Sequence, residues 1–572
     1  MTRKIALICT LTFFGAAALF AADIAPAFSR EAIGAKSFPP PPRIVSAAAI
    51  SPALSIGAAD PTDIEEVRVW NAEGRRPVKN GFVRIMADLV VVRLAGAPAS
   101  KGVIATSERG LVWSGRFQIA AHRVRLRLDR AKLPAGAVLW IYNDGGEPIA
   151  FDRDLLDSDG GLWTPSVGGG IVHLEVETPM PKSDADVASF EINRLLEIVP
   201  PLKTHDDPDC LIDVQCVGAS SVADINSFKQ GIAYLEYVKG NGGFVCSGGL
   251  LNDSTSSGTP WFLTANHCFD SQASATSLEA YWDWRFASCS STAIPNPPTA
   301  GRTLGATLLA TNGSSDFTFV RLSSIPANRY FFGSSTATVP AGTLLHRVSH
   351  PAPDDFGPLP QMYSASTVNT VVGQCQGRLR PNYLYSIFTP TQGGLYGGSS
   401  GSPVIAYLTG APRVVGQLLG YCGQVPADGC DTRNSVLDGA FSATFASISQ
   451  FLSATPAGCT PTATAMCLNN DRFKVEATYQ TGSGQTGQGQ VVKLTGDTGY
   501  LWFFNSSNVE VVIKVLNACG INGWWVFAGG LTDVRVTLTV TDTKTGSVKQ
   551  YTNPLGQPFQ PIQDTSAFSV CP

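Results

Sequence analysis

Three short motifs carry side chains capable of nucleophilic chemistry, and they occur in the order His, Asp, Ser. They are TANHC at 264–268, SSDFTFV at 314–320 and GGSSGSP at 397–403. A serine hydroxyl is a weak nucleophile at neutral pH, so it needs a neutral imidazole to accept its proton. The imidazole in turn needs a carboxylate to hold its tautomer and stabilise its charged form. We predict that Ser400, His267 and Asp316 fill these three roles.

The glycines around Ser400 predict a second part of the same machinery. The backbone N–H groups of Gly398 and Ser400 are expected to converge on the oxyanion that develops during acyl transfer, and side chains would obstruct that approach. The chain order also excludes an α/β-hydrolase, which runs Ser, acid, His and carries Gly-x-Ser-x-Gly at a strand-to-helix elbow. We therefore expect acyl-transfer chemistry on a different scaffold.

The composition limits what kind of scaffold this is. The chain has 572 residues, 15% of them charged, and a net charge of −4. About three domains with real cores are expected, and nucleic-acid binding driven by basic charge is disfavoured. A short basic start and the apolar run 5–20 are typical of a secretory signal peptide within 1–27, cleaved after Ala22 or Ala27. No other segment is long enough to span a membrane.

Alternating polarity predicts β-structure on both sides of the motifs. Val124, Leu126 and Leu128 alternate with arginines, which predicts an N-terminal β-rich domain over 28–205 with one solvent-facing side. A helix is predicted over 183–198, stopped by Pro200-Pro201. The catalytic region is placed at 206–455. The last part, 456–572, alternates again and predicts a β-domain.

The cysteines divide in the same way. One of the thirteen lies in the signal segment, eight lie between Cys210 and Cys430, and four lie between Cys459 and Cys571. Even groups in an exported chain predict separate sets of disulfides. For the tail, Cys459–Cys467 with Cys519–Cys571 is the simplest of three arrangements.

With these motifs in place, the middle region resembles the chymotrypsin-like serine peptidases, and among them the bacterial secreted lysyl endopeptidases. The resemblance covers about 245 residues and rests on ordered segments: 210–216, 246–252, 262–268, 281–282, 315–318, 350–351, the Ser400 motif and 416–418. It implies a mainly β chain with two antiparallel β-barrels, the triad between them, and a C-terminal helix over Phe445, Ile448 and Leu452. The flanks are then a pro-region and a C-terminal β-sandwich.

The resemblance also implies disulfides. They are Cys246–Cys268, Cys216–Cys289, and Cys210 with Cys430 or Cys422, which leaves Cys375 to the remaining one of these two. It implies no metal and no cofactor. The acidic segment at 205–207 is interpreted as an exposed loop because no further ligand is evident nearby.

The sequence departs from the family where specificity is set. A lysine-specific pocket needs an acid to meet the substrate ammonium, and that position is Val436 here, with Asp438 two residues away. The alternative acid position, near Gly394 and Leu395, is neutral. Leu419, after Leu418, stands where the family has a histidine. We expect cleavage after apolar or small residues rather than strictly after lysine, unless a loop shift brings Asp438 into the pocket.

The predicted function is a secreted, monomeric serine endopeptidase acting on protein or peptide substrates, without nucleic-acid partners. It should be silenced at acid pH, where His267 is protonated. Two alternatives stay open. One is an inactive homologue that binds extracellular partners, and the other is an esterase using the same triad. The C-terminal aromatics 502–504, 524–525 and 527 are interpreted as core, and the ligand of that domain is unknown.

Overall fold

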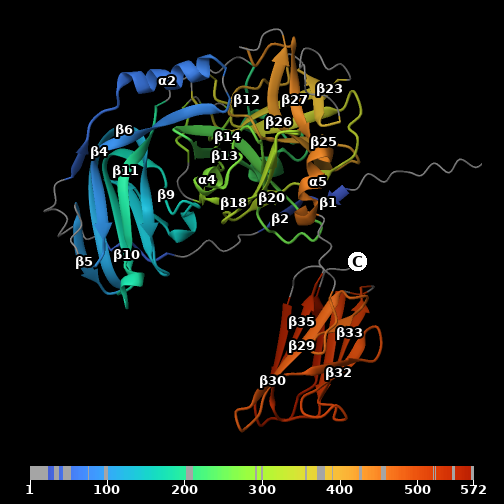
Figure 1. The fold of residues 1–572 in the computed structure, drawn as a ribbon. Coiled ribbons are helices and arrows are strands. Elements are labelled where there is room, and N and C mark those ends of the chain that lie inside the picture. The colour runs from blue at the N-terminus through green and yellow to red at the C-terminus, as the bar shows by residue number, and fades with distance from the viewer. Residues whose placement is uncertain are drawn as a thin grey trace, which may run out of the picture.

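The chain is mainly β, as predicted (Figure 1). The computed structural model describes residues 23–30, 38–42, 53–74, 76–95, 101–200, 210–289, 291, 293–297, 301–353, 357–369, 381–388, 391–423, 428–452, 459–519, 521, 523–543 and 548–568. The apolar run of the expected signal peptide lies outside these residues. No helix within them is long and apolar enough to cross a membrane.

The N-terminal region is a strongly elongated sheet. Its central strands run in the order β4, β11, β6, β10, β7, β8, with β3, β5 and β9 also on β6. Helix α2 (Pro61–Ala72) is the element that comes before β4 in the chain. The strands are β3 (Leu54–Ile56), β4 (Val78–Arg93), β5 (Val103–Ser107), β6 (Gly110–Lys132), β7 (Val138–Asn143), β8 (Ile149–Phe151), β9 (Leu162–Trp163), β10 (Val167–Thr178) and β11 (Ser189–Ile198).

Two predictions for this region are wrong. Residues 183–198 are not a helix, because only Asp184–Asp186 form a 3-10 turn and Ser189–Ile198 form β11 between β4 and β6. The register slips between Ile192 and Arg194, so the buried positions lose strict alternation and mimic helical spacing. The arginine side of β6 is also not solvent-facing. Arg125 and Arg127 are buried, because Arg125 reaches the Ser277 carbonyl of the catalytic region and Arg127 lies over the Trp163 ring of β9.

The first barrel of the catalytic region is nearly closed. Its strands run in the order β17, β16, β13, β14, β15, β19, β18. They are β13 (Ile232–Lys239), β14 (Gly242–Leu251), β15 (Trp261–Thr264), β16 (Glu279–Trp282), β17 (Thr303–Leu304), β18 (Ala306–Asn312) and β19 (Phe317–Leu322), with helices α3 (Ile225–Gly231) and α4 (Gln272–Thr276). Strand β14 also pairs with β4, so the N-terminal sheet continues into this barrel.

The second barrel is a closed ring of six strands. The order is β26, β25, β22, β23, β24, β27, and β27 pairs back onto β26. They are β22 (Leu344–Ser349), β23 (Met362–Val368), β24 (Tyr383–Ile387), β25 (Pro403–Tyr407), β26 (Pro412–Gly423) and β27 (Asn434–Ala440), followed by the predicted helix α5 (Phe441–Leu452). The expected pair of barrels is therefore confirmed.

Short strands tie other segments to the barrels. Strand β12 (Ile212–Asp213) lies on β23. Near the start of the described chain, β1 (Asp23–Ala25) pairs with β21 (Ser334–Ser335), and β2 (Phe28–Arg30) pairs with β20 (Arg329–Phe331). Residues 23–30 therefore pack on the catalytic region rather than on the N-terminal sheet.

The C-terminal region is a sandwich of two five-stranded sheets that contain strands of this region alone. One has β28 (Met466–Leu468), β29 (Phe473–Gln480), β30 (Thr486–Gln488), β35 (Arg535–Asp542) and β36 (Val548–Asn553). The other has β31 (Gln490–Lys493), β32 (Thr498–Trp502), β33 (Val511–Ala518), β34 (Gly523–Gly530) and β37 (Ile562–Phe568). Of the aromatics expected in its core, Phe503 and Trp524 are buried, whereas Phe504 is exposed.

Four predicted disulfides are present. They are Cys210–Cys430, Cys216–Cys289, Cys246–Cys268 and Cys459–Cys467. Cys422 and Cys519 are also disulfide-bonded. Cys375 and Cys571, their expected partners, lie outside the described residues.

Candidate active site

His267 and Asp316 form a two-point contact at the edge of the first barrel. The Asp316 carboxylate accepts the backbone N–H of His267 at 3.0 Å and faces His267 Nδ1 at 2.8 Å. With the ring proton on Nδ1, the lone pair of Nε2 is left to accept a proton. His267 Nε2 is buried and has no hydrogen-bond partner among the residues that the structure describes. The imidazole is thus oriented and still able to act as a base.

The second barrel holds the Asp316 loop in place. Asp316 adopts a left-handed backbone conformation (φ 55°) directly before β19, which turns its side chain toward His267. Gln417, on β26, donates to the carbonyl oxygen of Ser315 at 2.6 Å, and the Ser315 hydroxyl bonds Thr444 of α5 at 2.9 Å. The carboxylate is buried, so its charge acts on the imidazole in an environment of low polarity.

The loop that carries Ser400 packs against the same edge. The backbone N–H of Ser247, on β14, donates to the Ser400 carbonyl at 2.8 Å, and the Ser247 hydroxyl donates to the Gly398 carbonyl at 2.9 Å. A Cβ on Gly401 would lie 2.2 Å from Thr264 Oγ1 and 2.8 Å from the backbone nitrogen of Ala265. The Ser400 loop therefore lies directly on the segment that leads to His267.

Glycine is required twice in this loop. Gly398 and Gly401 have φ of 90° and 81°, which side-chain-bearing residues rarely adopt. A Cβ on Gly398 would also lie 2.6 Å from the His350 carbonyl oxygen. The loop thus has the tight turn that an oxyanion-binding pair of N–H groups requires.

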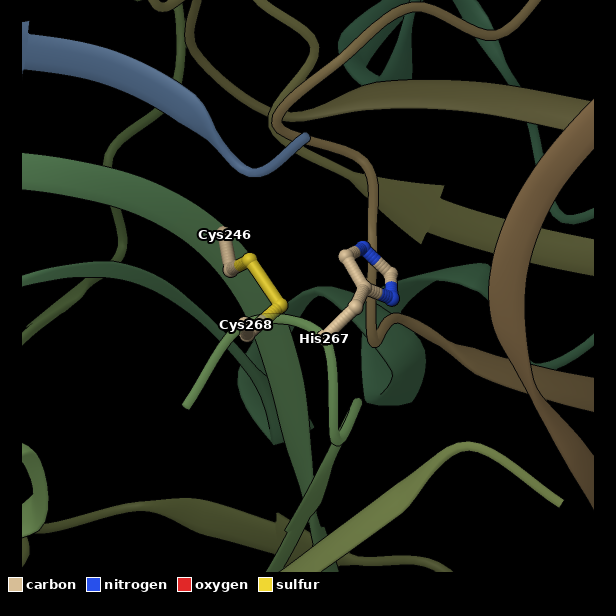
Figure 2. A group of neighbouring side chains, drawn as sticks. All are labelled: Cys246, His267 and Cys268. Carbon is tan, nitrogen blue, oxygen red and sulfur yellow. A yellow bond between two sulfur atoms is a disulfide. The ribbon is translucent and has the colours of Figure 1, made fainter. Parts of the chain in front are cut away.

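One cluster at this site has the residue types of a metal centre but cannot act as one. Figure 2 shows Cys246, His267 and Cys268 together, with the two sulfur atoms joined. Disulfide sulfurs are not thiolate ligands, and Nδ1 of His267 already faces Asp316. The disulfide instead fastens β14 to the residue that follows His267.

Four of the six specificity candidates fall into two separate clusters. Leu395, Leu418 and Val436 pack together with Phe388 in one apolar cluster. Gly394 lies on the Cys210–Cys430 disulfide, where a Cβ would be 2.3 Å from Cys210 Sγ. Leu419 belongs to a different cluster, with Tyr383, Tyr385 and Leu437. The structure thus brings together three of the candidates, and all three are apolar.

Asp438 lies in the interior of the second barrel. Arg347 donates to both of its carboxylate oxygens, and both side chains are fully buried. Burial raises the pKa of Asp438 despite the neighbouring guanidinium. The carboxylate that the sequence offered as a replacement acid is thus already paired.

A stacked aromatic group next to the Ser400 loop carried no functional signal in the sequence. His350 stacks on Trp284 with ring centroids 5.5 Å apart, and Trp284 packs on Tyr234 at 4.8 Å. Burial lowers the pKa of His350 to about 3, so this imidazole is neutral. The motif at 350–351 was visible as a family segment, but its neighbours come from distant strands.

Comparisons with known proteins agree with the resemblance drawn from the motifs. Residues 204–433 match the family model described as "Lysyl endopeptidase, C-terminal domain". A lysyl endopeptidase of Pseudomonas aeruginosa is 24% identical over 314 residues, which cover 52% of this chain and 66% of the relative. The match therefore spans just under two thirds of the relative's own length.

Proposed function

We propose that this protein is a secreted serine endopeptidase. The observation that carries the proposal is the His267–Asp316 contact beside the Ser400 loop, within the segment that matches the lysyl endopeptidase model. In this mechanism His267 Nε2 takes the Ser400 proton as Oγ attacks a peptide carbonyl, and then gives that proton to the leaving amine. Water hydrolyses the acyl-enzyme by the same route.

Charge stabilisation falls to the loop glycines. The N–H groups of Gly398 and Ser400 are assigned to the oxyanion, and losing one such donor costs on the order of 3–4 kcal/mol in known enzymes. The Asp316 carboxylate is assigned to stabilise the imidazolium that forms on His267 during the reaction.

The substrate pocket is assigned to the apolar cluster. Leu395, Leu418 and Val436 offer no charge to a lysine side chain, and Asp438, the acid two residues after Val436, is paired with Arg347. A buried ammonium without a partner would be strongly disfavoured. We therefore propose cleavage after apolar or small residues.

Export and processing complete the proposal. The basic and apolar start of the chain and the disulfides fit a protein that matures outside the cell. The N-terminal region is assigned as a pro-region, joined to the catalytic region through residues around 201–209, which lie outside the described residues.

Labelling of the nucleophile tests the proposal. A fluorophosphonate should label the processed protein on Ser400, and Ser400→Ala and His267→Ala should each lower peptide hydrolysis by roughly 10⁴-fold or more. Ser402→Ala is the matched control, since this buried hydroxyl in the same loop makes no hydrogen bond among the described residues. Failure to label any processed sample would instead favour an inactive binding protein.

Substrate choice is tested separately with the labelled enzyme. A peptide library digested by processed protein should show cuts after apolar or small residues. A majority of cuts after lysine or arginine would reject the proposed pocket while leaving the peptidase activity intact. Esters that are hydrolysed in the absence of peptide cleavage would favour an esterase.

A further inference from the structure

The N-terminal sheet reaches the catalytic centre through the first residues of β4. Val78 pairs with Val245 and Lys79 with Phe244, in antiparallel register along β14. The next residue of β14, Cys246, is disulfide-bonded to Cys268, beside His267. In Figure 2 a faint blue ribbon of the N-terminal region runs beside the strand that carries Cys246.

The same segment touches the nucleophile loop. A Cβ built on Gly397 would lie 2.3 Å from Val78 Cγ2 and 3.2 Å from the guanidinium carbon of Arg76. Gly397 directly precedes Gly398, one of the two residues assigned to the oxyanion. Residues 76–78 therefore lie against the Ser400 loop without any side chain of that loop between them.

Val78 fills an apolar site built from the catalytic region. It is buried in a cluster with Tyr234, Val245, Tyr281, Trp284 and Ala352. All five belong to the two barrels or their connections, so the site belongs to the catalytic region and Val78 is its occupant. Its size and lining suit a branched aliphatic side chain.

Neighbouring contacts hold the occupant in an extended form. The Trp70 indole of α2 donates to the Pro77 carbonyl at 2.9 Å, and the Asn71 amide brackets the backbone of Lys79 with two 2.9 Å hydrogen bonds. An extended chain paired to a strand edge, with one side chain in a pocket, is how peptides are bound by strand addition.

The chain direction identifies which part of a substrate this resembles. Val78 pairs with the residue next to Cys246, which is joined to Cys268 beside His267, and from there to Phe82 the chain runs along β14 away from this point. His267 gives its proton to the leaving amine, so the half of a substrate that follows the scissile bond lies on the His267 side. Val78 thus stands where a residue after the scissile bond would stand.

We propose that Tyr234, Val245, Tyr281, Trp284, Ala352 and Gly397 form a substrate subsite on the leaving-group side. It takes a branched aliphatic residue, and Val78 of the N-terminal region blocks it by pairing with β14 as a substrate would. This inference rests on the proposed peptidase function. It adds a specificity determinant after the scissile bond to the pocket before it.

The first test compares two substitutions on one strand. In the full chain before processing, Val78→Asp places a charge in the apolar site and should raise the initial rate of peptide hydrolysis at least tenfold. Val91→Asp is the matched control, because Val91 lies on β4 with 42% of its surface exposed. Equal rates for wild type and Val78→Asp, both labelled on Ser400 by a fluorophosphonate, would overturn the blocking role.

The second test does not depend on folding of the Val78→Asp protein. Processed wild-type enzyme should favour valine or isoleucine over glycine or aspartate by roughly tenfold at one library position after the cut. Flat selectivity at every such position, in enzyme that labels and cleaves, would overturn the subsite alone. Absence of labelling would instead reject the proposed function itself.

Discussion

The two flanking regions are both β-rich, but they relate to the catalytic region in opposite ways. The N-terminal region shares one sheet with the first barrel through β4 and β14. The C-terminal region closes two sheets and a core of its own. One flank is therefore completed by the catalytic region, whereas the other is complete without it.

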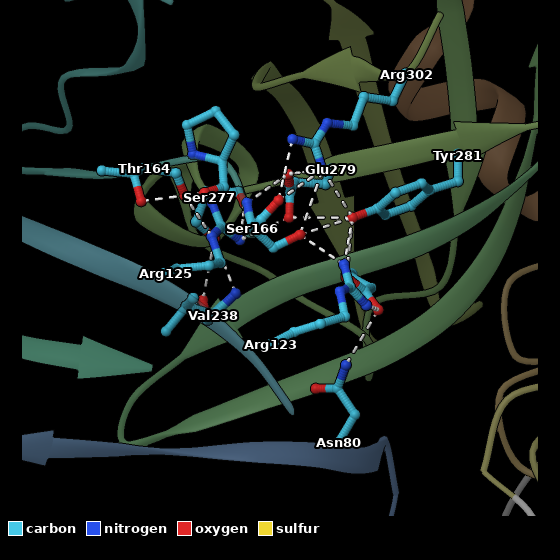
Figure 3. A network of polar contacts seen from close by, with 12 residues as sticks. Asn80, Arg123, Arg125, Thr164, Ser166, Val238, Ser277, Glu279, Tyr281 and Arg302 are labelled. Carbon is cyan, nitrogen blue, oxygen red and sulfur yellow. Dashed lines mark hydrogen bonds and ion pairs between the residues drawn. The ribbon is translucent and has the colours of Figure 1, made fainter. Parts of the chain in front are cut away.

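Buried charge shows the same difference. Figure 3 shows Arg123 and Arg125 of β6 meeting residues of the first barrel. Arg123 contacts both carboxylate oxygens of Glu236 at 2.8 Å, and Arg125 lies 3.8 Å from Glu279. In the C-terminal region the buried pair Arg472–Asp542 lies within one sandwich. The N-terminal charges find their counter-charges across the junction, so that face is built to be covered.

This difference separates two ways of breaking the junction. A substitution inside it leaves a partner charge buried and unpaired, which is costly. Separation of the whole N-terminal region returns both charges to water. Single substitutions can therefore destabilise this junction strongly, although the whole N-terminal region can still dissociate after the chain is cleaved.

Deletion of each flanking region should give the largest difference between the two flanks. Deleting residues 28–205 while keeping the signal segment should lower the secreted yield of labelled enzyme at least tenfold, since the β14 edge and two acids would be uncovered during folding. Deleting 456–572 should change yield and peptide hydrolysis less than twofold. Gel quantification and Ser400 labelling measure both. The reverse ranking would contradict the comparison.

Single arginine substitutions test the difference between the two flanks with the next largest expected effect. Arg123→Ala leaves Glu236 buried beside the junction, and Arg472→Ala leaves Asp542 buried in the sandwich. Each should cost roughly 3–5 kcal/mol of unfolding free energy. In denaturant melts, Arg123→Ala should lower the midpoint of the unfolding transition at which peptidase activity is lost. Arg472→Ala should lower the midpoint of a separate transition, in which the sandwich unfolds while peptidase activity is retained. One shared transition in both variants would show that the sandwich is not independent.

The sequence was most informative where function restricts residue type. His267, Asp316 and Ser400 stand in short motifs whose flanking glycines and strands are local, and four cysteine pairs were placed correctly. The motifs are readable because they depend on neighbours in the chain. The two barrels and the disulfides of the middle region were instead implied by the family resemblance that those motifs carry.

The wrong predictions concern which segments pack against a strand or a face of the sheet. The pattern of β6 was correctly seen as alternating, but alternation cannot say that a second domain lies on the arginine side. Residues 189–198 form a strand because β4 and β6 lie on either side of it, which no local pattern around the Ile192–Arg194 irregularity could reveal. The meeting of Val78 with Gly397 was equally unreadable, because it depends on the register of β4 against β14.

Acid should destabilise the junction more than the C-terminal sandwich, and this is the smallest of the expected differences. Burial alone would raise the pKa of Glu279, but Arg302 and Arg125 outweigh it and lower that pKa from 4.5 to about 2. A depressed carboxyl pKa contributes stability that is fully present above about pH 4.5 and is lost as the pH falls toward 2, here roughly 3 kcal/mol. In the sandwich, hydrogen bonds from Thr495 and Thr498 also lower the pKa of Asp497 to about 2, but this group is only partly buried and its contribution is smaller.

The midpoints of both unfolding transitions are measured at pH 7, 4.5, 3 and 2. Below pH 4.5, the midpoint of the transition at which activity is lost should fall more steeply than that of the sandwich. The amide in Glu279→Gln does not titrate, so this variant should be less stable at pH 7 but should lose part of that steepness. The sandwich transition of the same protein is the internal control. An unchanged slope in Glu279→Gln would mean that other carboxylates, and not this arginine-paired one, give the junction its sensitivity to acid.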